Sequence, residues 1–296
     1  MKLSQAIKTF IAWKTLATDD HTAMGYDREL RQFCLFLRNP DAGQITVDDV
    51  TTFLTGVAQL GWSWRGIAEK CKALRGFFAF CRRQGLAVLD EQLIPFPRKE
   101  FKIPRVAAEE DYQRLLGVIP RDSDPQHLRD RAILTMLWDT GMRAGELVSL
   151  NLGDIDFDRM RAVIKTEKSR GRRPFREVFW SPETNGYLAE WMDMRELLRV
   201  RDAEALFVCI TGSNPGKRLS VGGLGEMLRR TSRKARIPYA NAHSFRHRLG
   251  HAIVKNGGSA ADVMNILGHA SLASSTVYTM MTDRELEARY RLFKGW

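Results

Sequence analysis

The chain has 296 residues, of which 44% are hydrophobic and 27% charged, a composition typical of a globular protein with room for two domains. No apolar run approaches the roughly 20 residues of a membrane helix, and the four scattered cysteines exclude a Cys-x-x-Cys zinc or disulfide framework. The 46 basic and 35 acidic residues give a net charge of +11, which favours a polyanionic partner.

Residues 1 to about 97 carry helical patterns. The N-terminus leads into an amphipathic segment and does not resemble a signal peptide. Apolar residues recur every three or four positions over 22–37, and a second such stripe starts at Thr46 and continues to Val57. Ser63 is a candidate N-cap for a third stripe that ends near Cys81. We expect a helical bundle in which the aromatic residues form the core.

Prolines mark the end of this helical region. Pro95 and Pro97 stop the helical pattern, and the basic segment 98–105 is typical of an interdomain linker. Residues 1–97 contain 12 basic and 10 acidic residues, so most of the excess positive charge lies further along the chain. We therefore expect two domains, 1–97 and 106–296.

The second domain is predicted to open with helices. Glu109, Glu110 and Asp111 precede an apolar pair, as acids do at a helix N-terminus. The apolar stretch 130–138 predicts a second helix, which Gly141 should end. Arg143 then opens another helical segment that contains Glu146. A guanidinium in a turn suits an anion clamp, and a surface salt bridge with Glu146 is the alternative.

The period of the pattern changes after Phe157. Residues 160–165 and 175–180 read as two strands separated by a turn-rich segment, which predicts a β-hairpin. Between Arg159 and Arg176 there are eight basic residues and one acid, so the hairpin tip has an excess of seven positive charges. Contact with phosphates explains that excess better than a solvated loop. Further on, Ser220 is a candidate N-cap for a helix with a basic end, which Pro238 should terminate.

The most informative stretch lies near the C-terminus. His243 and Arg246 are three residues apart, so they share one face of a helix. The apolar residues from Val263 to Gly268 predict a helix with a glycine C-cap, and His269 follows it directly. Tyr278 comes nine residues later (278 − 269). Cations and polarised donors beside one phenol are what phosphoryl transfer to a tyrosine requires.

These motifs in this order resemble those of the tyrosine recombinases, the phage-integrase and Xer type of site-specific DNA recombinase. The order is an arginine motif at 139–150, a lysine, His-x-x-Arg, Leu-Gly-His and a tyrosine. The resemblance implies a mainly helical α+β fold in which a helical core-binding domain (SAM-like) and a catalytic domain form a C-shaped clamp around DNA. It also implies six catalytic residues, which are Arg143, Lys168, His243, Arg246, His269 and the nucleophile Tyr278.

The family analogy also implies how these residues divide the work. Arg143, Arg246 and His269 would hold the nonbridging phosphate oxygens, and His243 would transfer a proton or bind phosphate. A hairpin lysine would protonate the leaving 5′ oxygen. Lys168 fits that position best, and Lys165 is the alternative.

The resemblance implies a reaction without cofactor, metal or ATP, since a 3′-phosphotyrosine ester keeps the bond energy. The histidines of the 243–251 run have no acids or thiols beside them, which also argues against zinc. The implied partners are double-stranded DNA and three further subunits, in a homotetramer or a hetero-tetramer with a related recombinase.

The implied location is the bacterial cytoplasm, with the protein associated with the nucleoid. Residues 282–293 should form a last amphipathic helix that docks on a neighbouring subunit or on its own. Two alternative functions remain, a type IB topoisomerase-like activity and a non-catalytic DNA-binding protein of the same fold.

Overall fold

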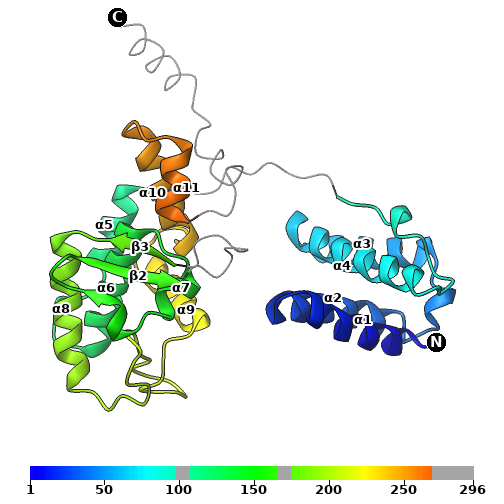
Figure 1. Ribbon diagram of the computed structural model, residues 1–296, viewed down its shortest axis with the longest axis horizontal. Helices are drawn as coiled ribbons and strands as arrows, with labels where there is room; N and C mark the ends of the chain where they lie inside the picture. Colours follow the sequence, from blue (N-terminus) through cyan, green and yellow to red (C-terminus); the bar gives the residue numbers. More distant parts are fainter. Residues whose placement is uncertain (98–106, 166–174, 269–296) are drawn as a thin grey trace, which may run out of the picture. The chain divides into compact units, whose positions relative to one another are not determined.

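The computed structural model describes residues 1–97, 107–165 and 175–268 (Figure 1). The chain divides into two compact units, Met1–Lys102 and Ile103–Trp296, and each unit has its own hydrophobic core. The expected linker at 98–105 lies outside the described residues. The described parts are mainly helical with one small sheet, which confirms the expected α+β class. Among these parts, no helix is long and apolar enough to cross a membrane.

The described part of the first unit, residues 1–97, is a four-helix bundle with two short 3-10 turns. Thr46 and Ser63 cap the third and fourth helices with their side chains, as the sequence predicts. Thr46 and Asp49 form a reciprocal capping box. The elements are α1 (Leu3–Ala17), α2 (Asp20–Phe36), η1 (Ala42–Gln44), α3 (Val47–Gln59), α4 (Trp64–Arg83) and η2 (Glu91–Leu93).

The core of the first unit is aromatic. Phe10 of α1 packs edge-on against Phe77 of α4, with ring centroids 5.8 Å apart, and Phe33 of α2 packs against Phe53 of α3 at 5.1 Å. Phe10, Phe33 and Phe77 are fully buried. The prediction that these aromatic stripes form the core is confirmed.

The second unit combines seven helices and three strands in its described part. The elements are α5 (Glu109–Gly117), α6 (Pro125–Thr140), α7 (Ala144–Val148), η3 (Leu152–Asp154), β1 (Ile155–Asp156), β2 (Arg161–Lys165), β3 (Phe175–Phe179), α8 (Pro182–Glu196), α9 (Val221–Lys234), α10 (Ala242–Lys255) and α11 (Ala260–Leu267). Helix α6 is buried on nearly all sides. It packs against α8 and α10, so it forms the centre of the unit (Figure 1).

The three strands form an antiparallel sheet in the order β1-β2-β3. In β2 and β3, Ala162 lies opposite Val178 and Ile164 opposite Arg176. Ala162, Ile164 and Val178 are buried, whereas Val163 is exposed, so one face of the hairpin packs on the core. The hairpin is therefore confirmed. Residues 166–174, which join its strands, lie outside the described residues.

Two left-handed glycines end the helices that lead to the predicted site. Gly141 follows α6 with φ 56°, and Gly268 follows α11 with φ 65°. Glycine adopts these angles without the steric cost that a Cβ would add. Both glycine stops were predicted, and both are confirmed. Arg143 follows two residues after Gly141, and Gly268 comes directly after the last residue of α11.

Helix α8 is absent from the elements predicted above. Its start carries a readable signal, because Ser181 accepts a hydrogen bond from the Thr184 amide and Pro182 occupies the first helical position. Tyr187, Leu188 and Trp191 form its buried stripe. The helix was therefore recoverable from the sequence.

Candidate active site

Three of the six predicted catalytic residues belong to the described part of the chain. Arg143 is the N-cap residue of α7, and His243 and Arg246 lie in the first turns of α10. Lys168, His269 and Tyr278 lie outside the described residues. The alternative lysine, Lys165, is the exposed last residue of β2.

Arg246 is almost completely buried, with 1% of its surface exposed. Its Nη1 donates a hydrogen bond to the carbonyl of Gly141 at 3.1 Å, and its Nη2 donates to the carbonyl of Leu267. Residues from three distant segments therefore meet at one guanidinium. A buried arginine with two backbone acceptors is fixed in orientation before any ligand arrives.

Arg143 also binds the C-terminal end of α11, one residue beyond the carbonyl that Arg246 binds. Its Nη2 donates to the carbonyl of Gly268 at 3.2 Å, and its Nη1 lies 2.6 Å from Oε1 of Glu146. The Glu146 side chain is fully buried, whereas that of Arg143 is 30% exposed. The salt bridge with Glu146 that was considered as the alternative is therefore present, but its carboxylate is buried and not at the surface. The buried Glu146 carboxylate thus pairs with the Arg143 guanidinium, which stays partly accessible.

The carboxylate of Glu146 is shared between two arginines. Its Oε2 accepts hydrogen bonds from the Arg143 amide at 2.9 Å and from Arg176 Nη2 at 2.8 Å. Burial alone would raise the pKa of Glu146, but the charges of Arg176 and Arg143 and the Arg143 amide outweigh burial and hold that pKa below its usual value. The group therefore stays ionised at neutral pH.

Arg176 is the residue of this site that sequence reasoning missed. The sequence presented it only as one of eight basic residues in the hairpin segment. In the structure its side chain is 8% exposed, and its Nη1 donates to the carbonyl of Ile266 at 2.9 Å. A contact across 90 residues leaves no trace in local spacing. The only available signal was its position opposite an inward-facing residue of the other strand.

Together, three arginines bind three successive carbonyl groups. Arg176, Arg246 and Arg143 donate to Ile266, Leu267 and Gly268, respectively. The last carbonyls of a helix lack intrahelical partners and carry partial negative charge, so they attract guanidinium groups. Both predicted phosphate-binding arginines, Arg143 and Arg246, therefore bind the C-terminal end of α11. His269 is the next residue in the sequence after that end.

His243 and His247 stand one turn apart on α10. Their ring centroids are 4.2 Å apart and nearly perpendicular. His243 is exposed and His247 is buried. Burial and the nearby charges of His243, His251 and Arg246 lower the pKa of His247 to about 4. His247 is therefore neutral at neutral pH. Within the described ranges, no three His, Cys, Asp or Glu side chains are placed to hold a metal ion.

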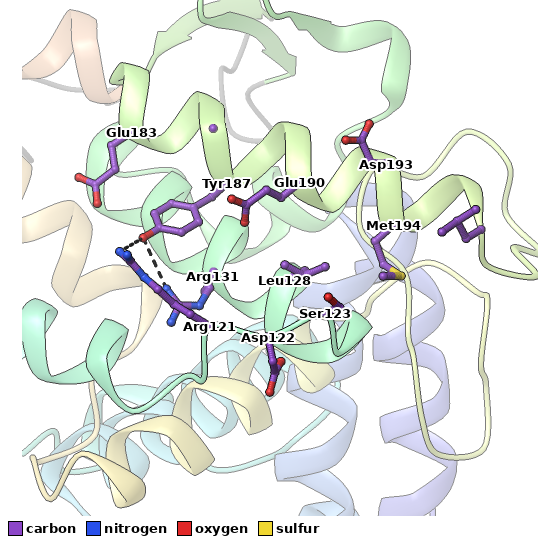
Figure 2. Close-up of a pocket in the computed structure, with 12 residues that line it drawn as sticks. Arg121, Asp122, Ser123, Leu128, Arg131, Glu183, Tyr187, Glu190, Asp193 and Met194 are labelled. Carbon is purple, nitrogen blue, oxygen red and sulfur yellow. Dashed lines mark hydrogen bonds between the residues drawn. The ribbon is translucent and has the colours of Figure 1, made fainter.

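A separate cavity of about 660 Å³ lies between α6 and α8 (Figure 2). The Tyr187 hydroxyl accepts hydrogen bonds from Arg121 at 2.9 Å and Arg131 at 3.5 Å. Four acidic residues line the cavity, and none of the predicted catalytic residues does. The lining residues are Arg121, Asp122, Ser123, Leu128, Arg131, Glu183, Gly186, Tyr187, Glu190, Asp193, Met194 and Leu197.

The chain thus combines a helical unit with a second unit of helices and a small sheet, in which three arginines converge on the end of α11. Residues 105–285 match the model of the phage integrase family, and residues 13–85 match the N-terminal SAM-like domain of phage integrases. The chain belongs to the phage integrase family. Its activity is site-specific recombination of the tyrosine recombinase type, which breaks and rejoins DNA, and the expected Xer-like resemblance is confirmed.

Named relatives agree with this assignment. The chain is 28% identical over 293 residues to the tyrosine recombinase XerC of Alcanivorax borkumensis, covering 97% of this chain and 92% of the relative. Its fold is similar to that of the XerH recombinase bound to palindromic difH substrate, with a TM-score of 0.69, 20% identity and coverage of 99% and 96%. The Tn1549 transposon integrase in complex with a circular intermediate DNA gives a TM-score of 0.76 at 17% identity, with coverage of 98% and 99%.

Proposed function

We propose that Tyr278 is the nucleophile of a strand exchange that passes through a Holliday junction. The phenol oxygen attacks the scissile phosphorus and forms a 3′-phosphotyrosine, while the bond from phosphorus to the 5′ oxygen breaks. The 5′-hydroxyl of a partner strand then reverses the step. The observation that carries this proposal is the convergence of Arg143 and Arg246 on the terminus of α11, 10 residues before Tyr278 (278 − 268).

The phosphate would lie against the arginines. Arg143 is partly exposed and can offer its remaining N–H groups, and Arg246 is fixed in orientation by two carbonyls. Two preorganised guanidinium groups stabilise the charge that grows on the nonbridging oxygens and favour the phenolate. His269 adds a further donor, and His243 transfers a proton or binds phosphate.

The leaving 5′ oxygen needs a proton, and a hairpin lysine supplies it. We assign this role to Lys168, with Lys165 as the alternative. Lys165 is exposed and pairs with Phe175 across the hairpin. Lys168→Ala should slow cleavage far more than Lys165→Ala, and a leaving 5′ thiolate should remove the difference, because it departs without a proton. The reverse ranking would assign the role to Lys165.

Both units would bind DNA, each with its own surface. Residues 1–97 are the core-binding domain and 106–296 the catalytic domain, joined by 98–105. The likeness to XerH bound to difH supports duplex DNA as the partner. Strand exchange between two duplexes needs four subunits, in a homotetramer or with a related recombinase. The energy stays in the phosphotyrosine ester, so neither ATP nor metal is needed. We place the protein in the cytoplasm, on the nucleoid.

A covalent-trapping experiment tests the proposal. Purified protein is mixed in EDTA with nicked suicide substrates made from chromosomal or element-derived DNA. An SDS-resistant adduct is expected for the wild type and not for Tyr278→Phe, which should still bind DNA. Sequencing of the trapped ends gives the recombination site. An adduct that persists in Tyr278→Phe would overturn the choice of nucleophile.

A further inference from the structure

We propose that Arg176 is a positioning residue of the active site, which fixes the Glu146 carboxylate and the end of α11 together and so holds Arg143 in place. The inference rests on the proposed phosphate-binding role of Arg143. It assigns to a strand of the basic hairpin a task other than contact with DNA.

The first argument is the sharing of one buried carboxylate. Glu146 Oε2 accepts hydrogen bonds from both Arg176 Nη2 at 2.8 Å and the Arg143 amide at 2.9 Å, and Oε1 accepts from Arg143 Nη1. A fully buried carboxylate between two guanidinium groups has one orientation that satisfies all three donors. Loss of Arg176 frees one side of that carboxylate, and Arg143 loses its fixed support.

The second argument is the link to α11. Arg176 Nη1 donates to Ile266, the first of the three successive carbonyls, and the next two carbonyls bind Arg246 and Arg143. A shift of the α11 terminus would therefore alter a hydrogen bond of each of the three arginines. Arg176 is the member of this set that comes from the hairpin, so it joins β3 to the helix end.

The third argument is burial. The Arg176 side chain is 8% exposed, and its Nε is buried without a hydrogen-bond partner among the described residues. Burying a charged side chain with an unsatisfied N–H costs free energy, which surface contact with DNA would not require. Burial lowers the pKa of Arg176, and the nearby Glu146 opposes that shift. The burial of Arg176 therefore fits a residue that positions Glu146 better than one that contacts DNA.

The test compares Arg176→Met, Arg176→Lys and wild type on a suicide substrate at saturating protein. We expect Arg176→Met to form adduct about 10- to 100-fold more slowly, the usual effect of removing a group that orients an active-site residue. DNA affinity, measured separately by gel shift, should change little. Weakened binding with an unchanged maximal rate would make Arg176 a DNA contact and overturn the inference.

The pH profile separates positioning from loss of fold. Removing the Arg176 charge leaves only Arg143 to oppose the effect of burial, so the pKa of Glu146 should be higher than in wild type. Protonated Glu146 no longer holds Arg143 as an ion pair, so the acid side of the rate–pH profile should move to higher pH in Arg176→Met. Arg176→Lys keeps the charge and should keep the wild-type profile at a reduced rate, since a lysine has one nitrogen in place of the planar fork whose two Nη atoms reach Glu146 and Ile266.

Arg195 provides a matched control. It is also a buried arginine of the second unit, and it donates to the carbonyls of Ala205 at 2.9 Å and Ala203 at 2.8 Å, away from the site. Arg195→Met should lower the melting temperature but leave the cleavage rate per folded, DNA-bound molecule and the pH profile unchanged. If Arg176→Met and Arg195→Met behave alike in rate and profile, Arg176 has no specific role.

A double-mutant cycle with Glu146→Gln tests the route of the effect. If Arg176 acts through Glu146, the double variant should be no slower than Glu146→Gln alone. Independent effects that multiply would overturn the route through Glu146. If the proposed function itself is wrong, the wild type will form no covalent adduct, and this result is distinct from any effect of the Arg176 variants. A wild type and an Arg176→Met variant that both cleave at the same rate would overturn only the present inference.

Discussion

Arg246 donates a hydrogen bond to the carbonyl of Gly141 across 105 residues of sequence, at 3.1 Å. This single bond joins the second arginine motif to the turn that presents Arg143. Gly141 has φ 56°, and a Cβ there would lie 3.3 Å from the Arg246 Cα and 3.1 Å from Leu249 Cδ2. The two motifs are therefore coupled through a residue that carries no catalytic group.

Gly141→Ala should reduce both stability and cleavage. The left-handed backbone costs a residue with a Cβ about 1 kcal/mol, and the close contacts add to that cost. We expect a lower melting temperature and slower adduct formation, because the Gly141 carbonyl can no longer stay in place for Arg246. The control is Gly186→Ala, within α8, where a Cβ meets nothing within 4 Å. That variant should be as stable as wild type or slightly more stable. Equal melting temperatures for Gly141→Ala and wild type would contradict the prediction.

Arg246→Lys should separate binding from cleavage. A lysine keeps the charge but has a single nitrogen, so it lacks the planar fork whose separate Nη1 and Nη2 donate to Gly141 and Leu267. Loss of one preorganised donor to a charged transition state costs about 100-fold or more in rate, so we expect adduct formation to fall by that factor while gel shifts still show DNA binding. Arg218→Lys serves as control, since Arg218 binds the carbonyl of Leu150 at 3.0 Å outside the site. Cleavage by Arg246→Lys at the wild-type rate would argue against its role.

His247 should make the stability of the second unit depend on pH. Its folded-state pKa is about 4, against 6.5 for an ordinary histidine. Between these values the unfolded chain binds a proton that the folded protein excludes, so the free energy of unfolding should fall as the pH drops from 6.5 to 4. The full effect is about 3 kcal/mol. Urea unfolding of wild type and His247→Gln at pH 7 and 5 measures it. The variant should lose less stability than wild type on acidification, and equal losses would refute the assignment.

The sequence was sufficient for features that local chemistry determines. Gly141 and Gly268 were readable as helix stops because a left-handed terminus favours glycine, and the change of period after Phe157 gave the hairpin. The burial of Arg246 and the contacts of Arg176 were not readable, because both depend on groups that tertiary packing brings near. The charge count suggested that Arg176 contacts DNA, whereas in the structure its side chain is 8% exposed and pairs with the buried carboxylate of Glu146.

Lys70 and Glu29 form a buried ion pair in the first unit, and the effect of breaking it on stability can be predicted. Lys70 Nζ lies 2.5 Å from Glu29 Oε2, the two side chains are 1% and 6% exposed, and the ammonium group also lies 4.3 Å from the Trp62 ring. Burial would raise the pKa of Glu29, but hydrogen bonds and charge from Lys70 and Arg28 hold it below its usual value. The carboxylate therefore depends on its partners to remain charged inside the protein.

Lys70→Met should destabilise the first unit by about 3 kcal/mol, because it leaves a buried carboxylate without its main partner. Adding Glu29→Met should recover most of that loss, since two apolar side chains need no charge compensation. Lys72→Met is the matched control on the same helix, since Lys72 is 55% exposed and lies 3.6 Å from Glu69, and it should change stability by less than about 0.5 kcal/mol. Amide hydrogen exchange in peptides of α2 and α4 reads the first unit within the full chain. Exchange that stays as fast in the double variant as in Lys70→Met would mean that Lys70 stabilises the bundle by packing and not by pairing.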